Sequence, residues 1–114
     1  MGTTSESTNN LGAHAANLAD LVTIQPGAVV SRTIVAEPAG TVTLFAFDAG
    51  QGLSEHSAPY DALVYSVEGE VEITISGVPQ RVKAGEMLIM PANEPHGLKA
   101  LSSFKMLLVM IRGK

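Results

Sequence analysis

The segment Gly85–His96, GEMLIMPANEPH, places a short apolar run between two turns and ends in a histidine. Gly85 follows Ala84 in the first turn, and Met87–Met90 is long enough for one strand. Pro91–Pro95 is rich in turn-forming residues, and its Asn93 tolerates a left-handed backbone. The segment therefore predicts a strand, a tight loop and a second strand that begins at His96.

The chain shows β patterning from Val22 onward. Val29–Ala36 and Thr41–Phe47 alternate in the period-two manner of half-buried strands, and Glu37–Gly40 forms a turn between them. In Glu70–Ile75 the apolar residues share one face and the polar residues the other. Further strands are expected at Asp61–Val67, Gln80–Lys83, His96–Ala100 and Phe104–Ile111. Roughly nine short strands, with turns between them, predict a sandwich or a closed barrel.

The two ends of the chain have a different character. Residues 1–10 are rich in Ser, Thr and Asn, which predicts a flexible tail, and residues 11–114 are expected to form a single domain. Leu11–Leu21 has loosely helical spacing and predicts a short N-terminal helix. Phe104–Ile111 is almost wholly apolar, so we expect it to be covered on both faces. Together with Val29–Ala36 it exceeds what a small core covers, which predicts a homodimer.

The composition bounds the function. Of the 114 residues, 46% are hydrophobic and 16% are charged, so the chain is able to build a core. Its net charge of −4 and the lack of a Lys/Arg cluster argue against a nucleic-acid partner. No apolar run is long enough to cross a membrane and residues 1–10 do not resemble a signal peptide, so we expect a cytoplasmic protein. The absence of cysteine excludes disulfides and thiolate metal sites.

Two segments of the chain resemble the paired motifs of the cupin superfamily, in particular its small single-domain, RmlC-like members. The second motif matches through Gly85, Pro91 and His96, with Asn93 where the family usually has glycine. The first motif lies in residues 50–69 and ends in the matching Gly69. The resemblance covers about residues 40–111 and implies an all-β fold, a small antiparallel β-barrel of jelly-roll type with a pocket inside.

The first motif departs from the metal-binding pattern of that family. Members that hold a metal have two histidines separated by one residue, followed by a glutamate. Here His56 takes the place of the first histidine, Ala58 that of the second, and the glutamate position falls on Ala62 or Leu63. His56 and His96 are the two ligands left, whereas Fe, Mn, Zn or Ni sites want three or four. The resemblance thus implies a pocket around His56, His96, Ala58 and Leu63, with an incomplete ligand set for a divalent transition metal.

Other polar residues near the first motif offer replacements. Asp61 substitutes for the lost glutamate if its strand turns it inward, and Leu63 and Tyr65 then share its face. Tyr65 suits either core packing or proton donation. The methionines are expected to fill the core rather than to bind metal. His14 is expected at the surface.

Three functions remain open at this point. The first is a non-catalytic barrel that binds a small molecule, and we rank it first because it demands least of the residues. The second is a metal-dependent enzyme, of dioxygenase or isomerase type, that uses His56 and His96. The third is a metal-free enzyme that resembles the sugar epimerase branch of the cupins, in which His56, Asp61 and Tyr65 handle protons. The sequence names no substrate for any of them.

Overall fold

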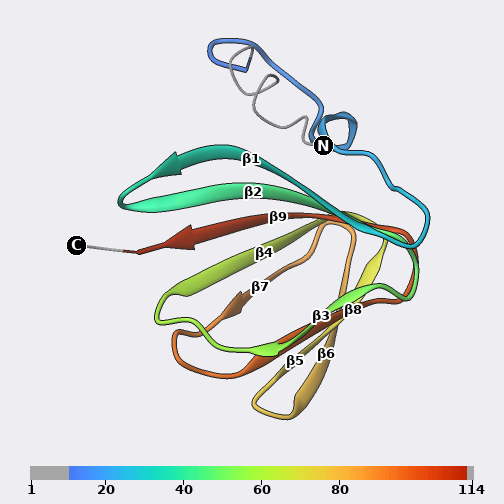
Figure 1. Ribbon diagram of the computed structural model, residues 1–114, viewed down its shortest axis with the longest axis vertical. Coiled ribbons are helices and arrows are strands. Elements are labelled where there is room, and N and C mark those ends of the chain that lie inside the picture. The colour runs from blue at the N-terminus through green and yellow to red at the C-terminus, as the bar shows by residue number, and fades with distance from the viewer. Residues whose placement is uncertain (1–10, 113–114) are drawn as a thin grey trace.

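The computed structural model describes residues 11–112 and shows two β-sheets packed face to face (Figure 1). Sheet A has five strands in the order β1-β2-β9-β4-β7, and sheet B has four in the order β3-β8-β5-β6. The antiparallel pairing of every neighbouring pair confirms the predicted all-β barrel of jelly-roll type. The strands are β1 Val29–Glu37, β2 Gly40–Phe47, β3 Gly52–His56, β4 Asp61–Glu68, β5 Glu70–Ile75, β6 Val78–Lys83, β7 Met87–Met90, β8 His96–Ala100 and β9 Phe104–Ile111.

Alternation along the central strands decides which side chains enter the space between the sheets. In β4 the buried residues are Ala62, Val64 and Ser66, while the residues between them face the other way. In β5 the buried residues are Val71 and Ile73, as the alternation in the sequence predicts. The core therefore lies between the two sheets and is built from one face of each.

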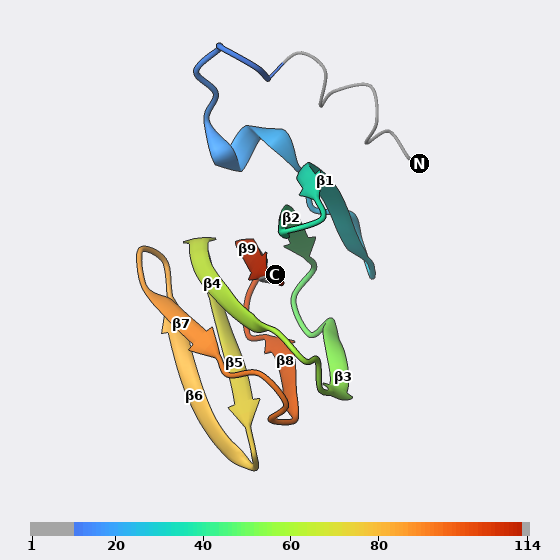
Figure 2. The same cartoon turned by 90° about the vertical axis from the view of Figure 1, so that its left-hand side faces the viewer.

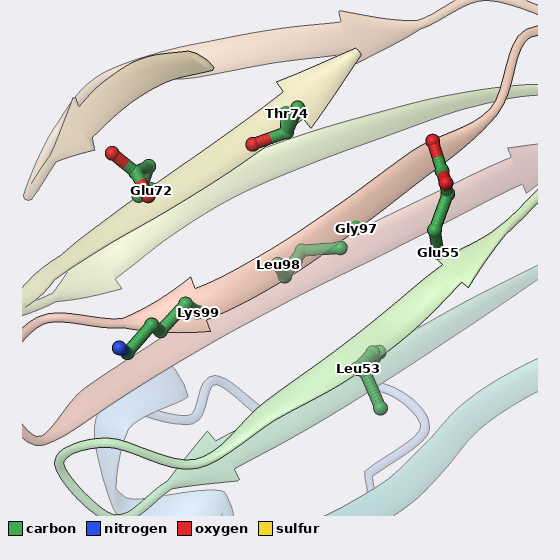
Figure 3. A pocket seen from close by; sticks show the side chains of 7 residues that line it. All are labelled: Leu53, Glu55, Glu72, Thr74, Gly97, Leu98 and Lys99. Carbon is green, nitrogen blue, oxygen red and sulfur yellow. The ribbon is translucent and has the colours of Figure 1, made fainter. Parts of the chain in front are cut away.

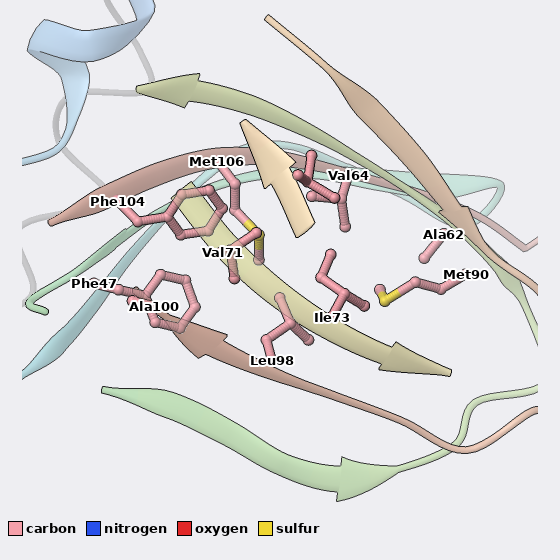
Figure 4. Packing of buried hydrophobic residues seen from close by; sticks show 11 residues of the cluster. Phe47, Ala62, Val64, Val71, Ile73, Met90, Leu98, Ala100, Phe104 and Met106 are labelled. Carbon is pink, nitrogen blue, oxygen red and sulfur yellow. The ribbon is translucent and has the colours of Figure 1, made fainter. Parts of the chain in front are cut away.

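Aromatic side chains close one end of this core (Figure 4). Phe47 and Phe104 have no exposed surface, and their ring centroids lie 5.5 Å apart. Phe45 lies on the same side of β2 and its ring centroid is 5.9 Å from that of Phe47. Smaller and more flexible residues take over toward the other end, where Ala62 and Met90 lie. The barrel is thus filled at one end and leaves room at the other.

The short helix predicted within Leu11–Leu21 is a single 3₁₀ turn. Only Leu18–Leu21 is helical, and the Asn17 side chain caps the turn by accepting from the Ala19 N–H at 3.0 Å. A single turn is too short to be stable alone, and packing supports it. Its leucines and the buried Val22 pack against Leu44 and Ala46 on the outer face of sheet A. Figure 2 shows the N-terminal segment on the side of sheet A that faces away from sheet B.

This cover extends over only part of β9, which corrects the expectation that the strand is covered on both faces. Phe104 and Met106 are buried between the sheets, and Leu107 packs against the N-terminal segment. Farther along, Val109 is half-buried and Ile111 is 59% exposed. The outer face of sheet A is therefore open toward its far end.

Two further expectations concern the N-terminal tail and membrane-spanning segments. The predicted flexible tail at residues 1–10 lies outside the described residues. Within residues 11–112, no helix is long and apolar enough to span a bilayer.

Candidate functional site

His56 and His96 meet at the open end of the barrel. His56 ends β3 and His96 begins β8, and the two residues face each other in the pairing of these strands. Their ring centroids lie 4.5 Å apart, with an angle of 68° between the ring planes. His96 is 5% exposed, whereas His56 is exposed at the edge of the cavity. Two of the three histidines of the chain, 40 positions apart in the sequence, therefore form one pair.

Backbone carbonyls orient both rings. Nδ1 of His56 lies 2.8 Å from the Ser54 carbonyl oxygen, and Nδ1 of His96 lies 3.1 Å from that of Glu94. Because a carbonyl only accepts, each Nδ1 carries the proton and donates it. In the neutral ring this leaves Nε2 with a lone pair, and a carbonyl bond at the other nitrogen is the usual means of orienting an imidazole ligand. The pair thus offers two preset acceptor nitrogens.

The cavity beside the pair is small and mostly apolar, with a volume of about 50 Å³. Such a space holds a few water molecules at most, and ordinary ligand pockets measure about 300–1,000 Å³. The histidines are its only ionisable lining groups among the described residues. The lining consists of Leu53, His56, Ala58, Ala62, Met90, His96, Leu98, Met106, Leu108 and Met110.

The two motif loops are joined directly at the mouth of this cavity. Asn93 adopts a left-handed backbone with φ 70°, as its place in the second motif predicts. Its N–H donates to the Ala58 carbonyl oxygen at 2.7 Å, so the loop before His96 is fixed to the loop after His56. The loops therefore hold the two histidine-bearing strands in register at this end.

Asp61, Leu63 and Tyr65 do not enter the cavity. Their strand does alternate, but Ala62 and Val64 are its inward residues, so the condition under which Asp61 would replace the glutamate, an inward orientation, is not met. Asp61 is exposed, and its Oδ1 accepts from the Ala92 N–H at 2.9 Å. The structure therefore gives Asp61 a role in holding the loop 91–95 and separates Leu63 and Tyr65 from the histidine pair.

The residues at the histidine pair do not fit the metal set of the resembled family. Ala58, at the position of the missing histidine, lines the cavity. Of the two positions considered for the glutamate, Ala62 lines the cavity and Leu63 does not, and neither alanine bears a ligand atom. Within residues 11–112, no group of three or more His, Cys, Asp or Glu side chains is placed to hold a metal ion. A hard divalent ion would therefore have two nitrogen ligands and no carboxylate here.

The expectation that the methionines fill the core is confirmed for Met90 and Met106 and is wrong for Met87, which is 49% exposed. Met90, Met106 and Met110 also line the cavity. Met90 pairs with Ala62 from β7, and Met110 pairs with Ala62 from β9 on its other side. Met106 lies deeper and is fully buried. The sequence did not show which methionines point into the cavity, because Met87–Met90 and Phe104–Ile111 are apolar on both faces. Strand pairing identifies the inward residues.

A larger hollow of about 310 Å³ lies on the outer face of sheet B (Figure 3). Glu55, Glu72 and Lys99 point along this face, which is open to solvent. None of these charged side chains is buried, and β3, β8 and β5 simply present their outward residues there. Size alone thus favours this groove, whereas burial and convergent nitrogen ligands favour the histidine cavity.

A small jelly-roll barrel with histidines facing each other at its open end defines the class of protein. The model of the cupin domain family matches residues 43–112, more than half of the chain. The chain therefore belongs to the cupin family.

Solved structures support this assignment. A conserved protein of unknown function from Streptococcus pyogenes is 38% identical, with a TM-score of 0.86 and 90% of each chain covered. A cupin 2 conserved barrel domain protein from Leptotrichia buccalis is 42% identical, with a TM-score of 0.82, and the match covers 85% of this chain and 47% of that one. A cupin superfamily protein from Desulfitobacterium hafniense is 25% identical, with a TM-score of 0.83, and the match covers 87% and 91%. No similar protein was found among curated proteins.

Proposed function

We propose that this cupin binds a small molecule in the barrel cavity, with the Nε2 atoms of His56 and His96 holding its polar end. The observation that carries the proposal is the histidine pair itself, whose rings lie 4.5 Å apart at the mouth of an otherwise apolar cavity. Apolar pockets with a few convergent polar groups are the usual form of a ligand site. The chain is in this account a binding module.

The size of the cavity restricts the ligand. At about 50 Å³ it admits a group of a few non-hydrogen atoms, and a nucleotide sugar does not fit inside. Leu53, Leu98 and Leu108 favour an apolar body for the part that enters. Two acceptor nitrogens favour a head group that donates hydrogen bonds. We therefore expect a short aliphatic compound with a hydroxyl or amine end.

The enzymatic alternatives have less support from the geometry. An acid–base enzyme of the epimerase type needs Asp61 or Tyr65 at the histidine, and both lie on the outer face of β4. A metal-dependent dioxygenase or isomerase needs more ligands for Fe, Mn, Zn or Ni than two imidazoles provide. Binding without catalysis requires only the groups that the cavity contains.

A fragment titration followed by NMR tests the proposal. The imidazole ¹⁵N resonances of the full chain are recorded while short alcohols and amines are added. We expect saturable shifts at His96 and none at His14, which lies outside the cavity lining. His14→Ala is the matched control and keeps the binding, whereas His96→Ala loses it. Backbone amide resonances are followed in the same titration, and shifts confined to Glu55, Glu72 and Lys99 on the outer groove, with His96 unchanged, would contradict the proposal.

We also propose that the protein is a homodimer that uses the open part of the outer face of sheet A. Val35, Met87, Ile89 and Ile111 are each at least 44% exposed on this sheet. The N-terminal segment already covers the neighbouring part, and a second copy extends the cover across the same sheet. Ile89→Lys should convert a dimer to a monomer in light scattering, while Lys99→Ala should not. A wild-type monomer at micromolar concentration would refute this.

A further inference from the structure

We infer that the histidine cavity is a site for a soft monovalent cation, Cu(I), held by His56 and His96 from sheet B and by Met90 and Met110 from sheet A. The inference goes beyond the proposed function, because it assigns a metal ion to the same cavity. It starts from a substitution pattern inside the barrel. The position of the expected carboxylate is Ala62, and the two residues that pair with Ala62 on either side are both methionine.

The placement of these four residues is set by the strand register. Met90 and Met110 flank Ala62 at the same level of sheet A, and all three line the cavity. Because Ala62 has only a methyl group, the space between the two longer side chains stays open. On the opposite sheet, His56 and His96 face each other and line the same cavity. Packed sheets lie about 10 Å apart, a distance that an imidazole and a thioether bridge together.

The chemistry of the donor set selects the ion. Thioether sulfurs are soft ligands that favour Cu(I), whereas Mn, Mg and Ca favour carboxylate oxygen. Imidazole accommodates copper as well, and carbonyl bonds at Nδ1 already point both rings with Nε2 as the free nitrogen. Two nitrogens and two sulfurs provide four ligands without any carboxylate. The set that fails for a hard divalent ion is therefore complete for a soft one.

The low polarity of the cavity also favours a monovalent ion over a divalent one. The cost of taking an ion out of water grows with the square of its charge, so a divalent ion is penalised about four times as much as a monovalent one. No acidic side chain lines the cavity to offset that penalty. Met90 is 3% exposed and His96 is 5% exposed, so these two ligands are screened from water, whereas His56 lies at the exposed edge of the cavity. A cavity of about 50 Å³ is also better matched to a single ion than to an organic cofactor.

Anaerobic competition with a chromophoric Cu(I) chelator tests the inference on the full chain. We expect equimolar Cu(I) binding and a copper K-edge absorption spectrum with both nitrogen and sulfur scatterers. The double substitution Met90→Leu with Met110→Leu keeps the side-chain volume and should weaken binding roughly tenfold or more. Met87→Leu is the matched control, because Met87 lies in the same strand on the outer face and is 49% exposed. It should leave the affinity unchanged.

The histidine variants complete the test. His96→Ala should weaken Cu(I) binding at least as much as the methionine pair, whereas His14→Ala should have no effect. The inference is overturned if no Cu(I) binds, if the Met90/Met110 variant binds as tightly as the wild type, or if Zn²⁺ displaces Cu(I) at equal concentration. If Cu(I) does not bind while small alcohols still shift the His96 imidazole resonance, the copper site is refuted and the proposed function is retained. If neither Cu(I) nor the alcohols shift the His96 resonance, the copper site and the proposed function are both refuted.

Discussion

Replacing Gly69 by alanine should destabilise the protein far more than replacing Gly85, although both glycines have left-handed backbones and both lie in turns between strands. Their φ angles are 82° and 88°. A Cβ at Gly85 would meet nothing within 4 Å, so Gly85→Ala costs only the left-handed strain of about 1–2 kcal/mol. A Cβ at Gly69 would lie 2.0 Å from the Ser103 carbonyl oxygen and 2.9 Å from Phe104 Cα. Relieving that overlap requires backbone movement, which adds about 1–3 kcal/mol.

Urea denaturation measures the difference in unfolding free energy between the two glycine variants. Gly69→Ala should lower the free energy of unfolding by about 2–5 kcal/mol, against about 1–2 for Gly85→Ala, with the m-value unchanged in both. Because typical stabilities are about 5–15 kcal/mol, the Gly69 variant loses a large part of the total. The midpoint temperature of thermal unfolding should fall by about 4 °C for each kcal/mol of unfolding free energy that is lost. Equal losses for the two variants within about 0.5 kcal/mol would refute the close approach of β9 to this turn.

Three further changes separate structural roles from the site. Phe104→Ala removes a fully buried ring from the closed end of the barrel and should cost about 3–5 kcal/mol in a urea titration; a loss below about 1 kcal/mol would contradict the packing described for that end. Asp61→Ala removes the acceptor for the Ala92 N–H and should cost about 1 kcal/mol while ligand affinity at His96 stays unchanged; loss of binding without loss of stability would restore Asp61 to the site. Asn93→Gly should leave stability within about 1 kcal/mol of the wild type in thermal unfolding, because glycine adopts the same left-handed backbone, and a larger loss would point to a contact of the Asn93 side chain.

Much of the fold could be predicted from the sequence because turn residues divide it into strands. The turns at Glu37–Gly40 and at Gly85, and the left-handed Asn93, all appear where the pattern places them. The strand β3, Gly52–His56, was not delimited in advance, since glycine, serine and glutamate there give no alternation. This strand matters because it places His56.

The site was predicted less completely than the fold. His56 and His96 were identified by their motif positions, and the structure brings them together. Whether Asp61 or Ala62 faces inward depends on a shift of one residue in a strand that is apolar on both faces, and such a strand does not define its own register. The methionines beside Ala62 were missed for the same reason, because only the pairing of β4 with β7 and β9 brings them to the cavity.

The methionine methyl resonances provide the most direct test that this chain acts inside its barrel. In a ¹H–¹³C spectrum of methionine-labelled protein, Met90 and Met110 report on the cavity, and Met87 reports on the outer face of the same sheet. On titration with a short aliphatic alcohol or amine, the account predicts that Met90 and Met110 shift until the cavity is saturated, while Met87 stays in place. A spectrum in which Met87 moves, or in which Met90 and Met110 do not, would contradict it.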